Sequence, residues 1–152
     1  MLRLVIGPPA AGKSTWVEER ATPDDVVIDF DRIAQALTGP GAPSHGQEGA
    51  IGDIAYRARE AAISEALRHG RELDIYVIHC VPSAQVISRF EAAGAEIVKV
   101  DPGRSVVMER CKAQRDKGAY RAVERWYANT DLHRFPPAVA YVPGKSRGSR
   151  RW

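Results

Sequence analysis

Short apolar runs alternate with amphipathic stretches along most of the chain. Apolar runs bounded by turn residues predict β-strands, and they lie at 2–6, 24–31, 74–80 and 95–100. Apolar residues at helical spacing predict α-helices between and after these runs, at 12–20, 32–37, 50–69, 83–93 and 104–128. Strands that alternate with helices predict an α/β fold, in which a parallel sheet collects ligands at the carboxyl ends of its strands.

The pattern predicts one main domain over residues 1–131, with a parallel sheet of four to five strands between two helical layers and a helical lid. Residues 38–49 hold four glycines and two prolines and predict a loop without a core of its own. After the Pro-Pro pair at 136 and 137, residues up to 152 read as a tail. We expect 132–152 to be a basic, extended segment.

A glycine-rich loop follows the first predicted strand. "GPPAAGKS", residues 7–14, has the spacing G-x-x-x-x-G-K-[ST] of a Walker A phosphate-binding loop. Backbone N–H groups of such a loop surround phosphate oxygens at the start of a helix. The residues predicted to bind nucleotide are Gly7, Pro8, Pro9, Ala10, Ala11, Gly12, Lys13, Ser14 and Thr15. Lys13 would reach the β- and γ-phosphates, and the Ser14 hydroxyl would bind Mg²⁺.

The acids at the strand ends indicate which kind of nucleotide-binding protein this is. The third strand ends in His79 and Cys80 without an acid, which argues against a motor ATPase. The second strand ends in "DFDR", so Asp29 is a candidate general base and Arg32 a candidate ligand of the acceptor phosphate. The alternative for Asp29 is that it only caps the following helix.

The last predicted helical region is strongly charged. Five basic residues fall within 12 positions: Arg110, Lys112, Arg115, Lys117 and Arg121. An arginine from a mobile lid can stabilise the charge of a phosphoryl group in transfer, and Arg115 is the first candidate and Arg110 the second. The alternative is a solvated helix face. Asp101, after the fourth strand, is a candidate Mg²⁺ contact or, in preference, a helix cap.

Charge and composition limit the cellular setting. The net charge is +3, but residues after Asp131 carry +5 and no acid, so the basic part is the tail. It could neutralise phosphates of a nucleic acid or be a solvated terminus. No apolar run is long enough to cross a bilayer, and the histidines and two cysteines have no zinc-site spacing. We therefore expect a soluble, cytoplasmic protein with reduced Cys80 and Cys111.

The two specific motifs, "GPPAAGKS" and "DFDR", resemble those of the 5′-kinase domain of phage-type polynucleotide kinases. The resemblance implies that Lys13 and Ser14 contact phosphates and metal, and that Asp29 is the general base. It also implies that Arg32 contacts the acceptor phosphate and that Arg115 or a neighbour contacts the donor phosphate. The phosphatase signature that many relatives carry is not found in this sequence, so 3′-end repair is not expected.

The expected function is therefore an ATP- and Mg²⁺-dependent kinase that transfers the γ-phosphoryl group to the 5′-hydroxyl of DNA or RNA. One alternative is a kinase for a nucleoside, a sugar acid or an antibiotic. Another is an ATP-binding accessory protein that transfers nothing. The sequence leaves the oligomeric state open.

Overall fold

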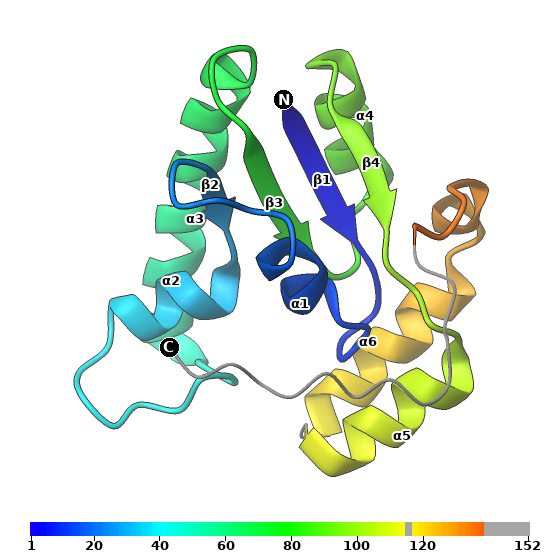
Figure 1. The fold of residues 1–152 in the computed structure, drawn as a ribbon. Helices are drawn as coiled ribbons and strands as arrows, with labels where there is room; N and C mark the ends of the chain where they lie inside the picture. The colour runs from blue at the N-terminus through cyan, green and yellow to red at the C-terminus, as the bar shows by residue number, and fades with distance from the viewer. Residues whose placement is uncertain (115–116, 139–152) are drawn as a thin grey trace.

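The computed structural model describes residues 1–114 and 117–138, which form a parallel four-stranded sheet with helices on its two faces (Figure 1). The strands are β1 (Leu2–Ile6), β2 (Val26–Ile28), β3 (Ile75–His79) and β4 (Glu96–Lys99). Their order across the sheet is β2-β3-β1-β4, and every neighbouring pair is parallel. The α/β fold with a parallel sheet that the sequence predicts is confirmed.

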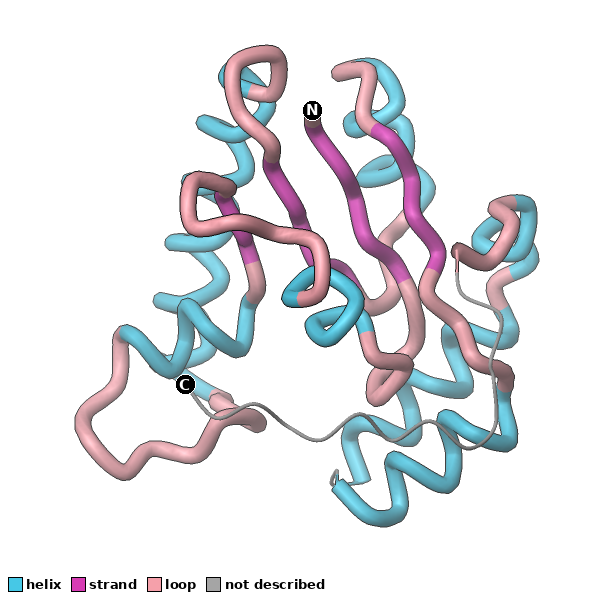
Figure 2. The backbone as a smooth tube through the Cα atoms, in the orientation of Figure 1, coloured by secondary structure: helices cyan, strands magenta, loops and turns pink. Residues whose placement is uncertain are grey.

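Helices alternate with the strands, as Figure 2 shows. They are α1 (Lys13–Glu18), α2 (Phe30–Ala36), α3 (Gly49–His69), α4 (Ala84–Ala92), α5 (Arg104–Gln114) and α6 (Lys117–Ala128), followed by the 3₁₀-helix η1 (Thr130–Arg134). The region predicted as helical over 104–128 consists of two helices, α5 and α6, that pack side by side (Figures 1 and 2).

The side chains of β1 divide the core into two parts, because successive strand residues point to opposite faces of the sheet. Leu2, Leu4 and Ile6 pack with Ile63 of α3 and Phe90 of α4. On the opposite face, Val5 of β1 belongs to a second cluster with residues of α1, α5 and α6. These residues include Val17 of α1, Val107 and Cys111 of α5, and Val123 of α6. Through these two clusters, helices pack against both faces of the sheet.

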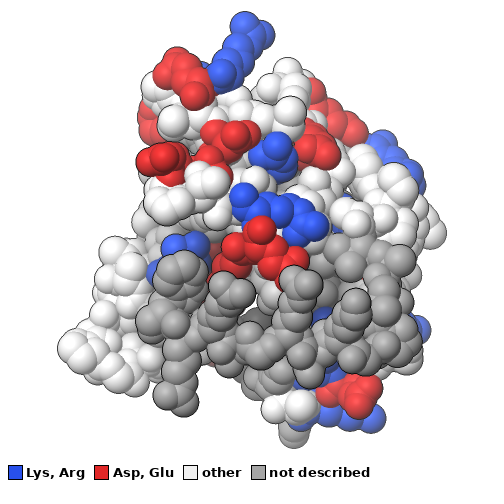
Figure 3. All heavy atoms as spheres, viewed as in Figure 1, with Lys and Arg blue, Asp and Glu red and all other residues white. Residues whose placement is uncertain are grey.

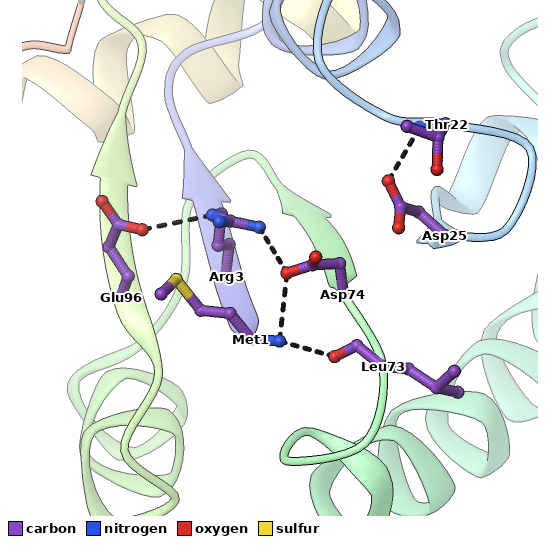
Figure 4. Close-up of polar contacts among 7 residues, drawn as sticks. All are labelled: Met1, Arg3, Thr22, Asp25, Leu73, Asp74 and Glu96. Atoms are coloured by element: carbon purple, nitrogen blue, oxygen red, sulfur yellow. Dashed lines mark hydrogen bonds and ion pairs between the residues drawn. The ribbon is translucent and has the colours of Figure 1, made fainter.

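Helix α1 stands in front of the carboxyl half of the sheet, and no described helix lies over the amino half on that face (Figure 1). Charged side chains occupy this part of the sheet instead (Figure 4). Arg3 of β1 reaches Asp74 at 3.1 Å on one side and Glu96 of β4 at 3.2 Å on the other. The N-terminal amine pairs with Asp74 at 3.0 Å and donates to the Leu73 carbonyl at 2.6 Å.

Packing continues past the expected domain boundary at residue 131. Leu132 of η1 is 1% exposed and belongs to the core that β1, α3 and α4 share. Pro137 then forms a parallel bridge with Lys99, and the Ala138 N–H donates to the Lys99 carbonyl at 2.7 Å. Residues of the expected tail, 132–152, thus pack against the domain as far as 138, and its part at 139–152 lies outside the described residues.

The surface carries both signs of charge. On the face seen in Figure 3, basic and acidic side chains of the described residues are interspersed. None of the helices in the described part of the chain is both long and apolar enough to span a membrane.

Candidate active site

The glycine loop runs from the end of β1 into α1, and two of its glycines are required for different reasons. A Cβ on Gly7 would lie 2.1 Å from the carbonyl oxygen of Val100, so the neighbouring chain excludes any side chain there. This contact is an additional reason for Gly7 beyond the approach of a phosphate that the motif implies. Gly12 has φ +95°, a left-handed conformation that favours glycine, and Ala10 adopts φ +59°.

Lys13 places its ammonium inside the loop. Its Nζ donates to the carbonyl of Gly7 at 3.0 Å and to that of Pro8 at 2.7 Å, and the residue is 6% exposed. These carbonyl contacts hold the ammonium inside the loop, and its contact with nucleotide phosphates stays a prediction. Pro9 faces α5, with its carbonyl 3.9 Å from the Cys111 sulfur, and Thr15 is exposed in the first turn of α1.

Asp29 joins the end of β2 to the glycine loop. Its Oδ1 accepts from the Asp31 N–H at 3.2 Å, which caps α2, and its Oδ2 accepts from the Ser14 hydroxyl at 3.3 Å. The residue is 9% exposed. Asp29 thus caps α2 and also contacts the glycine loop, and its role as a general base stays a prediction.

Arg32 lies in the first turn of α2, three positions after Asp29. Its side chain is exposed and makes no hydrogen bond or ion pair with the described residues. The loop after α2 is tied back to this turn, because His45 Nδ1 lies 3.0 Å from Asp31 Oδ2. The guanidinium is therefore not engaged by the described residues.

Arg110 of α5 reaches the glycine loop from the opposite side. Its Nη1 donates to the carbonyls of Ala10 at 3.3 Å and Ala11 at 3.4 Å. The first candidate for the lid arginine, Arg115, lies outside the described residues. Among the described basic residues of the lid, the structure brings Arg110 to the site.

Asp101 anchors the lid helices. Its carboxylate accepts from Trp126 Nε1 at 2.9 Å and from the Tyr127 hydroxyl at 2.7 Å, both on α6, and from the Gly103 N–H at 3.0 Å. Burial and the hydrogen bond to Asp101 raise the pKa of Tyr127 above its ordinary value. The carboxylate therefore stabilises the turn before α5 and the position of α6, and the sequence pattern does not indicate the α6 contacts.

Two further residues reach the carboxyl edge of the sheet without having been predicted as site residues. Arg59 of α3 is 5% exposed, and its Nη2 donates to the Ile78 carbonyl at 2.9 Å. His79, the last residue of β3, is partly exposed, and burial together with the charges of Arg59 and Lys13 lowers its pKa to about 4. The sequence signal for Arg59 is a charged residue at the helical spacing of Ala55, Ile63 and Ala66.

The donor set fits a magnesium ion that is held mainly by a nucleotide. The Ser14 hydroxyl is exposed beside a carboxylate, and Mg²⁺ is usually bound by one or two protein oxygens, substrate phosphates and waters. Among residues 1–114 and 117–138, no cluster of three His, Cys, Asp or Glu side chains could hold a metal by itself.

A parallel sheet whose first strand leads through such a loop into a helix defines a P-loop nucleotide-binding domain. The family comparison agrees with this class. A family model described as "AAA domain" matches residues 2–130, and the chain belongs to that family.

The fold is also similar to that of a chain in a solved assembly, "Structure of the Pnkp1/Rnl/Hen1 RNA repair complex". The match has a TM-score of 0.60 and 13% sequence identity, and it covers 99% of this chain and 52% of that one. This chain thus spans about half the length of its structural neighbour. The likeness confirms the resemblance at the level of the fold. No curated protein gives a significant sequence match.

Proposed function

We propose that this domain is a kinase that transfers the γ-phosphoryl group of ATP to a hydroxyl group, with the 5′-hydroxyl of a polynucleotide as its acceptor. The hydrogen bond between Ser14 and Asp29, at 3.3 Å, is the observation that carries the proposal. It joins the residue expected to contact the metal to the carboxylate expected to act as base.

The transfer would take place between Asp29 and Lys13. The Asp29 carboxylate accepts the proton of the acceptor hydroxyl, whose oxygen forms a bond to the γ-phosphorus. The bond from that phosphorus to the oxygen bridging the β- and γ-phosphates breaks, and ADP leaves with the electron pair. Lys13 neutralises charge on the phosphates during this exchange.

The two arginines would act on opposite sides of the transferred group. Arg110 reaches the loop from α5 and would bind donor phosphate oxygens in place of the carbonyls of Ala10 and Ala11. Arg32, exposed on α2, would bind a phosphate of the acceptor. Arg115, the first candidate on the lid, remains a proposed second contact to the donor. A bound Mg²⁺, held by the Ser14 hydroxyl, would supply charge neutralisation between the β- and γ-phosphates.

The polynucleotide acceptor rests on three considerations. Arg32 offers a cation next to Asp29 that pairs with none of the described residues. The acceptor end of a polynucleotide has a phosphate one sugar away from its 5′-hydroxyl, whereas a nucleoside has none. The structural neighbour, in turn, belongs to an RNA repair complex. The basic residues that follow 138 would add affinity for the nucleic acid backbone.

The test offers radiolabelled ATP and Mg²⁺ with 5′-hydroxyl oligonucleotides of DNA and RNA and, separately, with a panel of nucleosides and sugars. The proposal expects label on the oligonucleotide ends. An oligonucleotide with a 5′-phosphate is the matched control and should remain unlabelled. Label only on a small molecule would overturn the polynucleotide acceptor, and ATP hydrolysis without any labelled acceptor would overturn the kinase.

A further inference from the structure

His79 occupies the position in the sheet that lies between the two halves of the proposed reaction. Strand β3 is between β2, which leads to Asp29, and β1, which leads into the glycine loop. Ile6 pairs with His79 in the register of β1 and β3, so His79 lies next to the residue that precedes the glycine loop. Carboxyl ends of parallel strands are where such sheets bind their ligands.

The ring of His79 has hydrogen-bonding capacity that the described residues leave unused. It is partly exposed, and neither ring nitrogen pairs with a residue in 1–114 or 117–138. A neutral imidazole has one donor and one acceptor nitrogen.

Two cations lie close enough to this ring to act on it electrostatically. Lys13 lies in the loop, and Arg59 lies on α3 behind the end of β3, and both act on His79 together with burial. The combination disfavours a second proton on the ring, so the imidazole stays neutral at physiological pH. An anion between these cations is electrostatically favoured, and the neutral ring can donate to it.

Arg59 belongs to α3, and not all of its N–H groups have a hydrogen-bond partner among the described residues. Its Nη2 donates to the Ile78 carbonyl at 2.9 Å, and its Nη1 is 3.4 Å from Glu60 Oε1. Its Nε is buried without a partner among the described residues. A buried guanidinium that keeps an unpaired N–H is costly, and its contact with Ile78 ties it to the residue just before His79.

We propose that His79 is a further catalytic residue, whose uncharged ring donates a hydrogen bond to a non-bridging oxygen of the phosphoryl group in transfer, and that Arg59 is the positioning residue behind it. The inference rests on the proposed kinase function. His79 keeps its proton throughout, so Asp29 remains the group that accepts the proton of the acceptor. The hydrogen bond strengthens as negative charge spreads over the phosphoryl oxygens.

The test compares the kinetics of two substitutions that differ in one property. His79→Phe keeps the size of the ring without an N–H, and His79→Gln keeps a neutral N–H donor. We expect His79→Phe to lower kcat by about 10-fold or more, with the KM for ATP and for the acceptor changed less than about 3-fold. His79→Gln should recover at least part of that loss.

The matched control is His69→Ala, because His69 is exposed at the far end of α3 and contacts Glu72. It should retain the kcat of the unsubstituted chain. If His79→Phe also retains it, or raises only the KM of the acceptor, the assignment is overturned while the proposed function stands. An unsubstituted chain that labels no hydroxyl acceptor overturns the proposed function, and this inference with it. If His79→Phe does not fold, the kcat values of His79→Gln, His79→Asn and His79→Ala are compared instead. Values for His79→Gln and His79→Asn that are no higher than the value for His79→Ala would overturn the assignment.

The role of Arg59 is tested by NMR titration of the His79 ring. Arg59→Met removes the charge but keeps much of the buried volume, and Arg59→Lys keeps the charge. We expect the pKa of His79 to rise in Arg59→Met and to stay lower in Arg59→Lys, with kcat lower in Arg59→Met than in Arg59→Lys. An unchanged His79 titration in Arg59→Met would overturn the positioning role.

Discussion

The Ser14 hydroxyl donates to Asp29 Oδ2 at 3.3 Å, across 15 positions of sequence and between the first turn of α1 and the cap of α2. The parallel sheet makes this contact possible, because β1 and β2 deliver their carboxyl ends to the same edge. The contact unites two motifs that the sequence places apart. The other carboxylate oxygen, Oδ1, accepts a hydrogen bond from the Asp31 N–H, and the two hydrogen bonds together fix the direction of the carboxylate.

Gly7→Ala should destabilise the fold, because the new Cβ would lie 2.1 Å from the Val100 carbonyl oxygen, a backbone atom that cannot move alone. We expect a loss of more than about 2 kcal/mol in the free energy of unfolding, measured by chemical denaturation. Gly39→Ala is the control, because no atom lies within 4 Å of its added Cβ and its φ is not positive. Equal stabilities of the two variants would contradict the close approach.

Arg110→Ala should slow phosphoryl transfer, because the guanidinium that reaches the glycine loop would be lost. We expect kcat to fall by about 10-fold or more, since removal of one donor to a phosphoryl oxygen costs on this order. Arg121→Ala, on the exposed face of α6, should stay within about 2-fold. A normal kcat for Arg110→Ala together with a loss in Arg115→Ala would return the lid role to Arg115.

The Asp101 contacts to α6 should appear as coupled losses of stability. Tyr127→Phe removes the 2.7 Å hydrogen bond to a carboxylate, which should cost about 2 kcal/mol and lower Tm by roughly 5 °C. The exposed Tyr56 offers a control, and Tyr56→Phe should leave Tm nearly unchanged. In a double-mutant cycle with Asp101→Asn, the two losses should not be additive. Additive losses would show that the two side chains do not interact.

His79 should make the stability of the domain depend on pH. Burial first, and then Arg59 and Lys13, lower its pKa from 6.5 to about 4 in the folded state. The unfolded chain therefore binds more protons between these values, and folding is destabilised as the pH falls from about 7 to 4. Relative to His79→Gln, the loss should be on the order of 3 kcal/mol at pH 4, measured by denaturant titration. A constant difference between the two proteins from pH 7 to 4 would contradict the lowered pKa.

The sequence predicts most of the fold because each strand and helix has a strong local signal. Apolar runs locate all four strands of the described sheet, and the glycine loop locates the junction of β1 and α1. That this region forms two helices, α5 and α6, packed side by side could not be predicted, because the charged sequence has helical spacing throughout. The order of the strands depends on long-range pairing, which periodicity does not encode.

The site is predictable where a motif encodes it and unpredictable where tertiary contacts create it. The contact of Asp29 with the loop follows from its position at a strand end, whereas the choice between Arg110 and Arg115 depends on how α5 packs. The burial of Arg59 and the anchoring of α6 by Asp101 arise only from packing between distant segments. A charged residue on a helix gives no local sign of which neighbour it will meet.

Asp29→Asn tests the central claim most directly, when transfer to a 5′-hydroxyl oligonucleotide is measured beside the affinity for ATP with Mg²⁺. The amide keeps the shape of the cap but cannot accept a proton from the acceptor. We predict a loss of transfer of about 10²-fold or more with the ATP dissociation constant changed by less than about 3-fold. Transfer at the rate of the unsubstituted chain would contradict the assignment of Asp29 as the base, and with it the kinase mechanism derived from the contact with Ser14.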